Sequence, residues 1–575
     1  MKNQEIARAF NEIADLLELK GENPFRIRAY RRAAQNLESM GRDITDMPED
    51  ERTSIQGIGK DLSGKITEYA TTGKIKTLEE LRREIPVGLT EIMAIPGVGP
   101  RTAKLLFDKL NIQNIDELEN HAREGKLQGL PGIKKKTEEN ILRGIEFMKR
   151  GRERQPLGMV LPIAEEIINR LRKEGSVRKA ELAGSLRRWK ETIRDIDILV
   201  TSTDPAAVMN AFVRIPSVEE VLLKGPTKTS VVLKEGLQVD LRVVEEGSFG
   251  AALQYFTGSK AHNIRIREMA VRKGLKVNEY GVFREKDGRK LGGRDEEDVY
   301  RILGLQYIPP ELREDTGEIE AAQKGKLPSL ITLEDIKGDL HVHSRWSDGR
   351  HRIEELAETA KQLGYRYIAI TDHSKGLGIA GGLTEEQLIE EMREVEALNR
   401  RLKDFRVLMG IEVDIRSDGL LDFSEETLRE LDFVIASIHS GFRQSRDQLT
   451  KRVLSAIKCP YVNAIAHPTG RIIGEREAYE IDMKAVLEAA KEAGTALEIN
   501  AFPFRLDLND RHIREAKELG IPLIISTDTH IKEQFGFMRY GVATARRGWL
   551  AKEDVVNTLD LKELEVFLKK SRKKV

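Results

Sequence analysis

The sequence predicts a multidomain protein, with helical domains first, an α+β domain in the middle and a parallel α/β barrel last. Its 575 residues exceed what one hydrophobic core usually holds. Short helical patterns with polar turns fill about the first 150 residues, whereas residues 155–315 mix helices with β-branched runs. From residue 336, short apolar runs alternate with amphipathic stretches, which is typical of a parallel barrel.

Composition narrows the class of protein. Lys+Arg and Asp+Glu balance at 95 each, so net charge predicts no polyanionic partner, and the 33% charged fraction leans towards a thermophile. Cys459 is the only cysteine, which excludes an intrachain disulfide and favours a reducing cytosol. No apolar run is long enough for a membrane span, and the N-terminus has no signal-peptide pattern. We therefore expect a soluble, cytoplasmic protein.

A glycine turn followed by a basic helix start recurs in the N-terminal region, in IQGIGKDLSGKI (55–66), IPGVGPRTAKLL (95–106) and LPGIKKKTEENI (130–141). The free N–H groups at such a helix start attract an anion. The pattern resembles the helix-hairpin-helix motif, which holds the phosphates of one DNA strand without reading sequence. One copy would fit an ordinary helical turn equally well, but three copies favour nucleic acid, although the third lacks the second glycine. The expected DNA contacts are Gly57, Gly59, Lys60, Gly97, Gly99 and Arg101.

Three aspartates mark a first candidate catalytic site. In RDIDILV, strand alternation places Asp195 and Asp197 on one face, and LQVDLRVV adds Asp240 on a second strand. Clustered carboxylates repel one another unless cations compensate them, and their hard oxygens favour Mg²⁺ or Mn²⁺. Two such ions can stabilise the attacking and leaving oxygens of a phosphoryl transfer. The alternative is a set of surface ion pairs with neighbouring arginines.

Several motifs around these aspartates resemble the X family of DNA polymerases. They are GSLRR (184–188), DID (195–197), VDLR (239–242) and YFTGSKAHN (255–263), and EEDVYRILGLQYIPPELRE (296–314) resembles the family's C-terminal end. The resemblance runs from the first residues to about residue 315. It implies an 8-kDa-like helical DNA-binding domain (1–80), a helix-hairpin-helix domain (81–150), a nucleotidyltransferase palm (151–246), a nucleotide-selecting domain (247–314) and a linker (315–335).

The same resemblance implies a role for each matched residue. Asp195 and Asp197 would bind both metals, while Asp240 would bind the catalytic one and accept the proton of the primer 3′-hydroxyl. Ser185 and Arg188 would hold the incoming triphosphate. The other expected nucleotide contacts are Gly184, Tyr255, Phe256, Gly258, Asn263 and Arg267; without the resemblance, the two aromatic residues would indicate simple core packing.

Lys65 falls where the animal polymerase of this family has the lysine of a deoxyribose-phosphate lyase, which forms a Schiff base with the abasic sugar. However, Asp61 stands where the family has a supporting lysine. A carboxylate there would stabilise the protonated, non-nucleophilic form of Lys65. We therefore expect the domain to bind the 5′-phosphate side of a gap, with Arg26, Tyr30 and Lys60 as candidates, and keep the lyase as the less favoured alternative.

Histidines and acids at strand ends mark a second candidate site. DLHVHS alternates, so His341 and His343 point the same way from a strand end. Further histidines and acids fall at or just after the ends of predicted strands, which in a parallel barrel converge on one mouth. A lone histidine there would usually be structural, but so many that obey one positional rule indicate metal ligands. The expected ligands are His341, His343, Asp348, His373, Glu412, His439, His467, Asp528 and His530.

Residues 336–575 resemble the PHP (polymerase and histidinol phosphatase) domain, a distorted (β/α)7-type barrel with a trinuclear site. The resemblance implies up to three Zn²⁺, Mn²⁺ or Fe ions. One would be held by His341, His343, Asp528 and a bridging Glu412, a second by Asp348, His373 and His530, and a third by Glu412, His439 and His467. Asn500 and Arg471 could touch a substrate phosphate or be structural.

Together the two resemblances imply a DNA-repair polymerase that fills short gaps, as in base excision repair. Its PHP domain would process DNA ends as a 3′–5′ exonuclease, abasic-site endonuclease or 3′-phosphatase. The expected partners are gapped or nicked DNA and dNTPs, with no membrane, for a monomer on nucleoid DNA in the cytoplasm. Two alternatives remain: a small-molecule phosphatase tethered to DNA by a polymerase-like module, and a non-catalytic scaffold for DNA ends.

Overall fold

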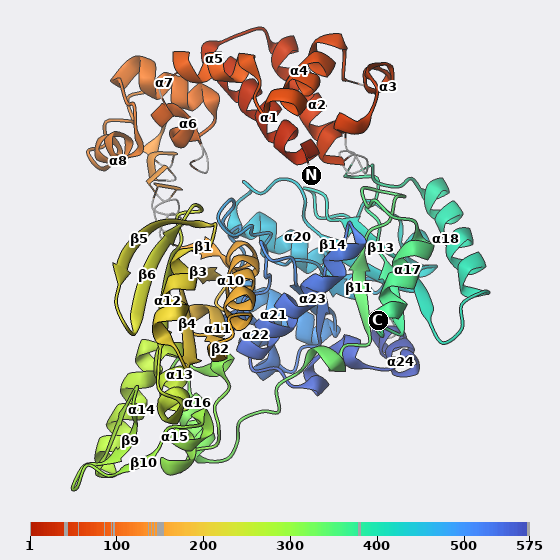
Figure 1. Ribbon diagram of the computed structural model, residues 1–575. Helices are drawn as coiled ribbons and strands as arrows, with labels where there is room; N and C mark the ends of the chain where they lie inside the picture. Colours follow the sequence, from red (N-terminus) through yellow and green to blue (C-terminus); the bar gives the residue numbers. More distant parts are fainter. Residues whose placement is uncertain are drawn as a thin grey trace. The chain divides into compact units, whose positions relative to one another are not determined.

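The computed structural model describes residues 2–571, apart from 40–43, 56, 86, 94, 96–97, 136, 140, 143, 146–153 and 378–380 (Figure 1). The chain forms two compact units, Met1–Glu153 and Arg154–Val575. In the described part of the chain, no helix is long and apolar enough to cross a membrane.

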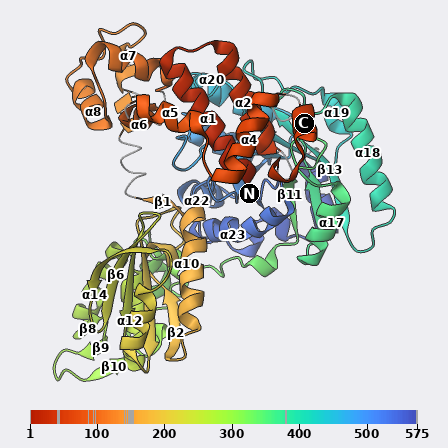
Figure 2. The same ribbon diagram turned by 45° about the horizontal axis from the view of Figure 1, so that its top comes forward.

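The N-terminal unit is helical, as expected. α1 (Lys2–Lys20) and α2 (Pro24–Ser39) lie side by side, with the rings of Phe10 and Tyr30 edge to face at 5.5 Å between centroids (Figure 2). The other helices are η1 (Ile44–Asp46), α3 (Glu49–Ser54), α4 (Lys60–Thr72), α5 (Lys76–Glu84), α6 (Val87–Met93), α7 (Pro100–Leu110) and α8 (Ile115–Arg123). Their apolar faces meet in one core confined to this unit.

Glycine turns precede α4 and α7, as the helix-hairpin-helix pattern predicts. Gly57 has a φ of 91°, a value that favours glycine, and Gly59 is the N-cap of α4. Gly99 is the N-cap of α7, whose first residue, Pro100, has a fixed φ suited to a helix start. Gly97 and much of the basic stretch after the third copy lie outside the described residues.

The second unit begins with a small mixed sheet. Its order is β2 (Val177–Leu182), β4 (Asp195–Ser202), β7 (Gln238–Val243), β6 (Lys228–Leu233) and β5 (Val218–Lys224), and only β4 and β7 pair in parallel. Ile196 and Ile198 of β4 share a core with α10 (Leu157–Arg172) and α12 (Pro205–Val213). Short β1 (Gln155–Pro156) and β3 (Thr192–Ile193) pair beside it, and α11 (Gly184–Arg187) joins β2 to β3.

The next region has a separate core. It contains η2 (Glu246–Ser248), α13 (Phe249–Thr257), α14 (Lys260–Arg272), the β-sheet of β8 (Leu275–Asn278), β9 (Gly281–Arg284) and β10 (Lys290–Gly292), α15 (Glu296–Ile302), η3 (Pro310–Leu312) and α16 (Glu318–Gln323). The sequence predicts a linker at 315–335, yet Ile319 and Ala322 of α16 belong to this core. The buried Glu318 carboxylate accepts a hydrogen bond from the His262 ring at 2.7 Å, which fixes α16 on α14.

The C-terminal region is a nearly closed parallel barrel. β11 (Gly338–Val342), β12 (Tyr367–Ile370), β13 (Arg406–Asp414), β14 (Phe433–Ser437), β15 (Ala464–Ile465), β16 (Ala496–Asn500) and β17 (Leu523–Ser526) pair in chain order. A bridge between Val342 and Thr529 brings the two ends of the sheet together. This confirms the predicted seven-stranded α/β barrel.

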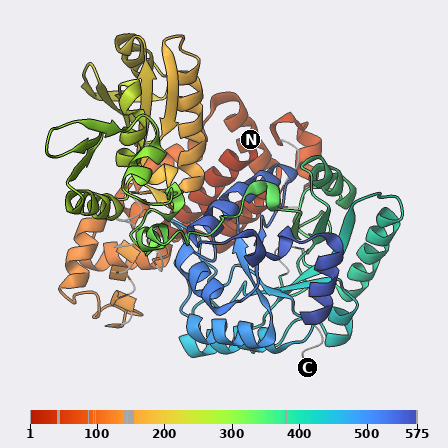
Figure 3. The ribbon, with the colours of Figure 1, turned by 90° about the horizontal axis from the view of Figure 1, so that it is seen from below.

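Helices surround the barrel strands (Figure 3). They are η4 (Leu333–Asp335), α17 (Ile353–Gln362), α18 (Glu385–Asn399), α19 (Glu425–Arg429), α20 (Arg446–Lys458), α21 (Met483–Ala493), α22 (Asp510–Leu519), η6 (Lys532–Phe537), α23 (Met538–Arg547), η7 (Lys552–Asp554), η8 (Val556–Thr558) and α24 (Leu561–Ser571). Leu564 and Leu568 of α24 share a core with inward-facing strand residues such as Leu340. The opposite, carboxyl ends of the strands stay free for polar side chains.

Candidate active sites

The three predicted aspartates lie together on the palm sheet. Asp197 of β4 is directly opposite Asp240 of β7, and Asp195 precedes it on the same face. Burial, followed by the charges of Asp195 and Asp240, raises the pKa of Asp197 to about 6. As anions these carboxylates therefore repel one another, and bound divalent cations would offset that repulsion.

The basic partners of these aspartates differ in part from the predicted alternative. Arg194 pairs with Asp195 at 3.2 Å, whereas Lys228 Nζ lies 2.8 Å from Asp240. Burial alone would raise the pKa of Asp240, but hydrogen bonds from Lys228 and Gln238 lower it. Lys228 belongs to no sequence motif, and its only signal is a position on the strand beside β7.

The Gly-Ser turn lies against this cluster. Gly184 has a φ of 62°, and a Cβ there would meet Asp197 Oδ2 at 2.3 Å. Only glycine fits, because both the backbone angle and the space exclude a side chain. Arg188 ends the same turn; its Nη1 donates to the carbonyl of Thr257, beside Gly258, and its Nε donates to Glu314 at 3.1 Å.

The other predicted nucleotide contacts cluster on α13 and α14. Tyr255 and Phe256 meet edge to face at 5.1 Å, and Arg242 lies 4.5 Å from the Phe256 ring centroid. Asn263 donates to the carbonyl of Tyr255 at 2.7 Å, and Arg267 Nε donates to the carbonyl of Asn263 at 3.3 Å. The Asn263 amide is therefore engaged within the protein in this conformation.

A hollow in the N-terminal unit contains two of the three predicted 5′-phosphate residues, Arg26 and Tyr30, but Lys60 does not line it. Arg26, Tyr30, Gly57 and Gly59 line it, together with Asp61. Lys65 Nζ lies 2.5 Å from Asp61 Oδ1, as expected from their spacing on one helix face. Elsewhere in the unit, the side chain of Arg101 is 91% exposed at the start of α7 and so remains accessible to an anion.

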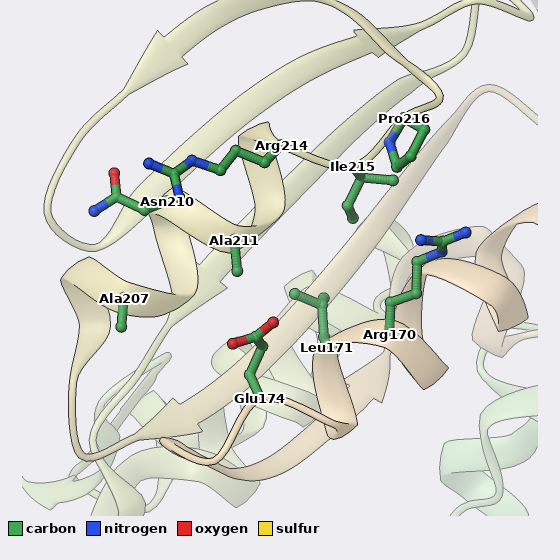
Figure 4. A pocket seen from close by; sticks show the side chains of 9 residues that line it. All are labelled: Arg170, Leu171, Glu174, Ala207, Asn210, Ala211, Arg214, Ile215 and Pro216. Atoms are coloured by element: carbon green, nitrogen blue, oxygen red, sulfur yellow. The ribbon is translucent and has the colours of Figure 1, made fainter.

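A second hollow lies on the palm, between the end of α10 and α12 (Figure 4). Arg170 and Glu174 border it on one side, and Asn210 and Arg214 on the other. None of the predicted site residues lines this hollow, and its opposed charges define no particular ligand.

All nine predicted metal ligands converge at the barrel mouth. Glu412, near the end of β13, is central: its two carboxylate oxygens lie between 2.8 and 3.6 Å from a ring nitrogen of His341, His343, His373, His439 and His467. Asp528 lies 3.3 Å from His343 Nε2, and Asp348 lies 3.3 Å from His530 Nε2. Nine side chains from six strand ends thus share one small volume.

Three clusters of side chains could each hold a metal ion. They resemble the three predicted groups, but some residues belong to a different cluster from the one predicted. The described residues form three: His343, Asp348, His373 and His530; His341, His343 and Asp528; and His373, Glu412 and His439. His343 belongs to two of them, and His373 replaces His467 in the third. His467 nevertheless lies 3.1 Å from Glu412 Oε1, so the partition among three ions follows the predicted one only in outline.

The electrostatics fit bound cations. Among the described residues, neither ring nitrogen of the buried His343 has a well-aligned hydrogen-bond partner. Burial, followed by His530 and His373, lowers the pKa of His343 to about 4, which keeps the ring neutral and able to bind a metal. Burial opposes protonation of His341 too, yet Glu498, Asp528 and Glu412 raise its pKa well above the usual value. A cation would replace that proton.

Two ligands have strained backbones. His467 has a φ of 26° and Asp528 a φ of 54°, in a region that residues with a side chain rarely adopt. Such strain is typically retained at functional sites, where it aims a side chain.

A supporting layer of acidic side chains, outside the predicted set, surrounds the candidate ligands. Glu498 of β16 accepts a hydrogen bond from His341 Nδ1 at 2.7 Å and another from the backbone of His467. Asp414, two residues after Glu412, accepts from the backbone of His439 at 3.3 Å. Both stand near strand ends, so the positional rule that found the ligands could have found them.

Asn500 and Arg471, for which both a phosphate contact and a structural role were considered, have different surroundings. Arg471 donates to the carbonyls of Arg505 and Leu506 and pairs with Glu191 at 2.8 Å, which makes it structural. Asn500 donates to Asp528 at 3.1 Å and therefore belongs to the metal cluster's surroundings. Arg505, also outside the predicted set, directs Nε to within 3.8 Å of Asp528.

Models of known families match four regions of the chain. Family models match a helix-hairpin-helix domain (1–75), a SAM-like helix-hairpin-helix tandem (89–146), a DNA polymerase beta thumb (252–314) and a PHP domain (339–502). The chain is 42% identical over 573 residues to the DNA polymerase/3′-5′ exonuclease PolX of Bacillus subtilis (strain 168), covering 99% of this chain and 100% of that protein.

Shorter relatives match the C-terminal region only. A probable phosphatase of Thermoanaerobacter sp. (strain X514) is 30% identical over 41% of this chain and 96% of its own length. A probable phosphatase of Caldanaerobacter subterraneus subsp. tengcongensis is 31% identical over 44% of this chain and 96% of its own length.

Proposed function

The chain belongs to the X family of DNA polymerases that carry a PHP domain, and from this premise we propose a function for each of its two centres. The protein is a DNA polymerase with a 3′–5′ exonuclease, and both centres use divalent metal ions. The finer assignments concern the residues, the ions and the DNA substrates.

The palm centre adds dNTPs at a primer end in a short gap. Asp195, Asp197 and Asp240 would hold Mg²⁺ or Mn²⁺, which supply charge neutralisation for phosphoryl transfer. A carboxylate oxygen of Asp240 accepts the proton of the primer 3′-hydroxyl. Gly184 leaves room for the triphosphate, Ser185 and Arg188 bind it, and the α13–α14 residues orient the sugar and base.

The barrel centre hydrolyses phosphoesters at DNA ends. Its nine ligands would hold up to three Mn²⁺, Zn²⁺ or Fe ions, which activate water and neutralise the phosphate. Besides 3′–5′ exonuclease action, the same chemistry serves abasic-site cleavage and 3′-phosphate removal. Glu498 and Asp414 orient ring nitrogens and backbone there.

The N-terminal unit binds the backbone of gapped or nicked DNA. Its exposed glycine turns at α4 and α7 present free N–H groups to phosphates. The ion pair between Lys65 and Asp61 favours 5′-phosphate binding over lyase chemistry, because the carboxylate occupies the amine that would have to attack the sugar. We place the protein as a monomer on nucleoid DNA in the cytoplasm.

The observation that carries this proposal is the completeness of both acidic and imidazole clusters within one chain. Three carboxylates on one sheet face and nine candidate ligands at the barrel mouth would be costly without bound cations. The similarity to PolX over the full length favours a DNA substrate over a tethered small-molecule phosphatase or a scaffold.

A paired substitution tests the division of labour. Asp240→Ala should lower dNTP addition on gapped DNA by at least about a hundredfold while 3′-end hydrolysis continues, because only the palm loses a metal ligand. His343→Ala should do the reverse. Matched controls are Asp287→Ala, on an exposed loop, and His351→Ala, a histidine on the same loop as Asp348 but outside the ligand set.

Loss of both activities in either variant, with its fold intact by circular dichroism, would refute two independent centres. Hydrolysis of histidinol phosphate without action on DNA 3′-ends would instead support the phosphatase alternative. Retained gap binding without dNTP addition in Mn²⁺ would support the scaffold.

A further inference from the structure

A barrel helix delivers an arginine to the polymerase region. Arg547, the last residue of α23, has a side chain only 5% exposed. Its Nη1 donates to the backbone carbonyl of Arg188 at 2.7 Å and lies 3.1 Å from Glu314 Oε1, while its Nη2 donates to Asp510. The planar guanidinium thus joins the barrel to the turn that ends at Arg188.

Glu314 is shared between two arginines. Its Oε1 accepts from Arg188 Nε at 3.1 Å and from Arg547 Nη1 at 3.1 Å, and Lys190 Nζ lies 4.0 Å away. Arg188 is therefore held at three points: its carbonyl by Arg547, its Nε by Glu314 and its Nη1 by the carbonyl of Thr257. Two of these three points depend on Arg547, one directly and one through Glu314.

We propose that Arg547 of the PHP barrel is a positioning residue for nucleotide binding at the palm, and that it acts by holding Glu314 and the backbone of Arg188. The inference rests on the proposed role of Arg188 as a triphosphate-binding residue. With this role for Arg547, the barrel contributes to nucleotide binding at the polymerase centre in addition to its own hydrolase activity.

The charges fix the direction of the effect. Burial would raise the pKa of Glu314, but Arg188, Arg547 and Lys190 lower it, so Glu314 is an anion at working pH. While Arg547 shares that anion, Arg188 keeps charge available for a triphosphate. Without Arg547, Glu314 would pair more strongly with Arg188 and compete with the nucleotide for it. The backbone carbonyl of Arg188 would also lose its hydrogen bond from Arg547.

The adjacent arginine is a matched control. Arg546 Nε donates to Glu311 at 2.7 Å and its Nη1 donates to the carbonyl of Ile331 at 2.9 Å, so it also anchors α23. Among the described residues, it forms no hydrogen bond or ion pair with Arg188 or Glu314. Loss of Arg546 should weaken the packing of α23 but leave the contacts of Arg547 with Glu314 and Arg188 in place.

The test measures steady-state dNTP addition on gapped DNA with Mg²⁺ for full-length Arg547→Ala and Arg546→Ala. Arg547→Ala should raise the KM for dNTP about tenfold with kcat changed much less, because roughly one charge-assisted hydrogen bond is lost from binding. Arg546→Ala should leave that KM within about twofold. Arg547→Lys, which keeps the charge, should recover part of the loss.

A double-mutant cycle checks the route through Glu314. In a Glu314→Gln background, Arg547→Ala should change the KM clearly less than in the natural protein, because the competing anion is gone. Equal KM changes for Arg546→Ala and Arg547→Ala would overturn the proposal in favour of simple docking, and an unchanged KM for Arg547→Ala would overturn it outright. Hydrolysis of DNA 3′-ends and the thermal unfolding midpoint report whether each variant is folded.

Failure of the premise has a different signature. If Arg188→Ala leaves the KM for dNTP unchanged, the assignment of Arg188 to the triphosphate is wrong. If Arg188→Ala raises the KM strongly while Arg547→Ala does not, that assignment stands and only the positioning role of Arg547 fails.

Discussion

At the scale of residues, Glu412 and its neighbours show why the barrel centre needs cations. Five imidazoles surround one fully buried carboxylate. Burial would raise the pKa of Glu412, but His439, His373 and His341 lower it well below its usual value, so it is anionic. Among the rings around it, His341, His373 and His439 have raised pKa values and retain protons that a metal ion would displace. Metal affinity should therefore depend on the groups that orient those rings.

Glu498→Gln tests this supporting layer. The carboxylate accepts from His341 Nδ1 and from Ser526 Oγ, at 2.7 and 2.8 Å, and an amide would present a donor to some of these groups. We expect metal affinity to fall about 10- to 100-fold, measured as the metal retained by the purified protein against a competing chelator. Glu488→Gln, on the exposed face of α21, is the control. Unchanged retention in Glu498→Gln would show that Glu498 only packs beside the site.

At the scale of elements, the sequence predicted the parts of the molecule in which strand alternation or position at a strand end determines where a side chain lies. Strand alternation placed Asp195 and Asp197 together, and the strand-end rule collected nine candidate ligands, eight of which form clusters compatible with a metal ion. Periodicity could not predict which side chains meet across two elements, such as α16 on α14 or Lys228 beside Asp240. These depend on which surfaces meet, and neither hydrophobic period nor local turn chemistry encodes that.

The tie between α15 and the palm gives a prediction at this scale. Glu296, only 6% exposed, accepts from Arg187 at 2.7 and 2.8 Å and also pairs with the fully buried Arg313. Burial would raise its pKa, but Arg313 and Arg187 lower it from 4.5 to about 2. A depressed pKa means that this carboxylate stabilises the fold above pH 4.5, and that the contribution, about 3 kcal/mol, is lost as pH falls through 2.

Glu296→Gln should therefore weaken the region at neutral pH. We expect faster hydrogen exchange over residues 296–314 at pH 7, since Arg313 would be left buried without its anion, and a smaller difference from the natural protein as pH falls from 4.5 towards 2. Glu297→Gln, the exposed neighbour on the same helix, should exchange like the natural protein. A difference that stays constant across this pH range would rule out the ionised carboxylate as its source.

At the scale of the whole molecule, the chain divides into two units with separate cores. The sequence predicted this organisation in outline, because hydrophobic patterns change near residues 150 and 336. It did not predict that the palm, thumb and barrel form one compact unit, Arg154–Val575. Tyr540 of α23 and Leu506 of the barrel pack in the palm core, and these contacts lack a periodic signal.

The separate core of the N-terminal unit predicts that it is an autonomous DNA-binding module. All buried residues of that core lie between Ile6 and Ile145, so a fragment of residues 1–153 should unfold cooperatively on its own. It should bind gapped DNA with an affinity whose logarithm falls linearly with the logarithm of the salt concentration, because basic side chains displace counterions from the backbone phosphates. Changing both Lys60 and Arg101 to alanine should lower that slope by about two, whereas Lys126→Ala should not. A fragment that folds but binds without salt dependence would move DNA recognition to the second unit, because the exposed basic side chains at α4 and α7 would then have no phosphates to neutralise.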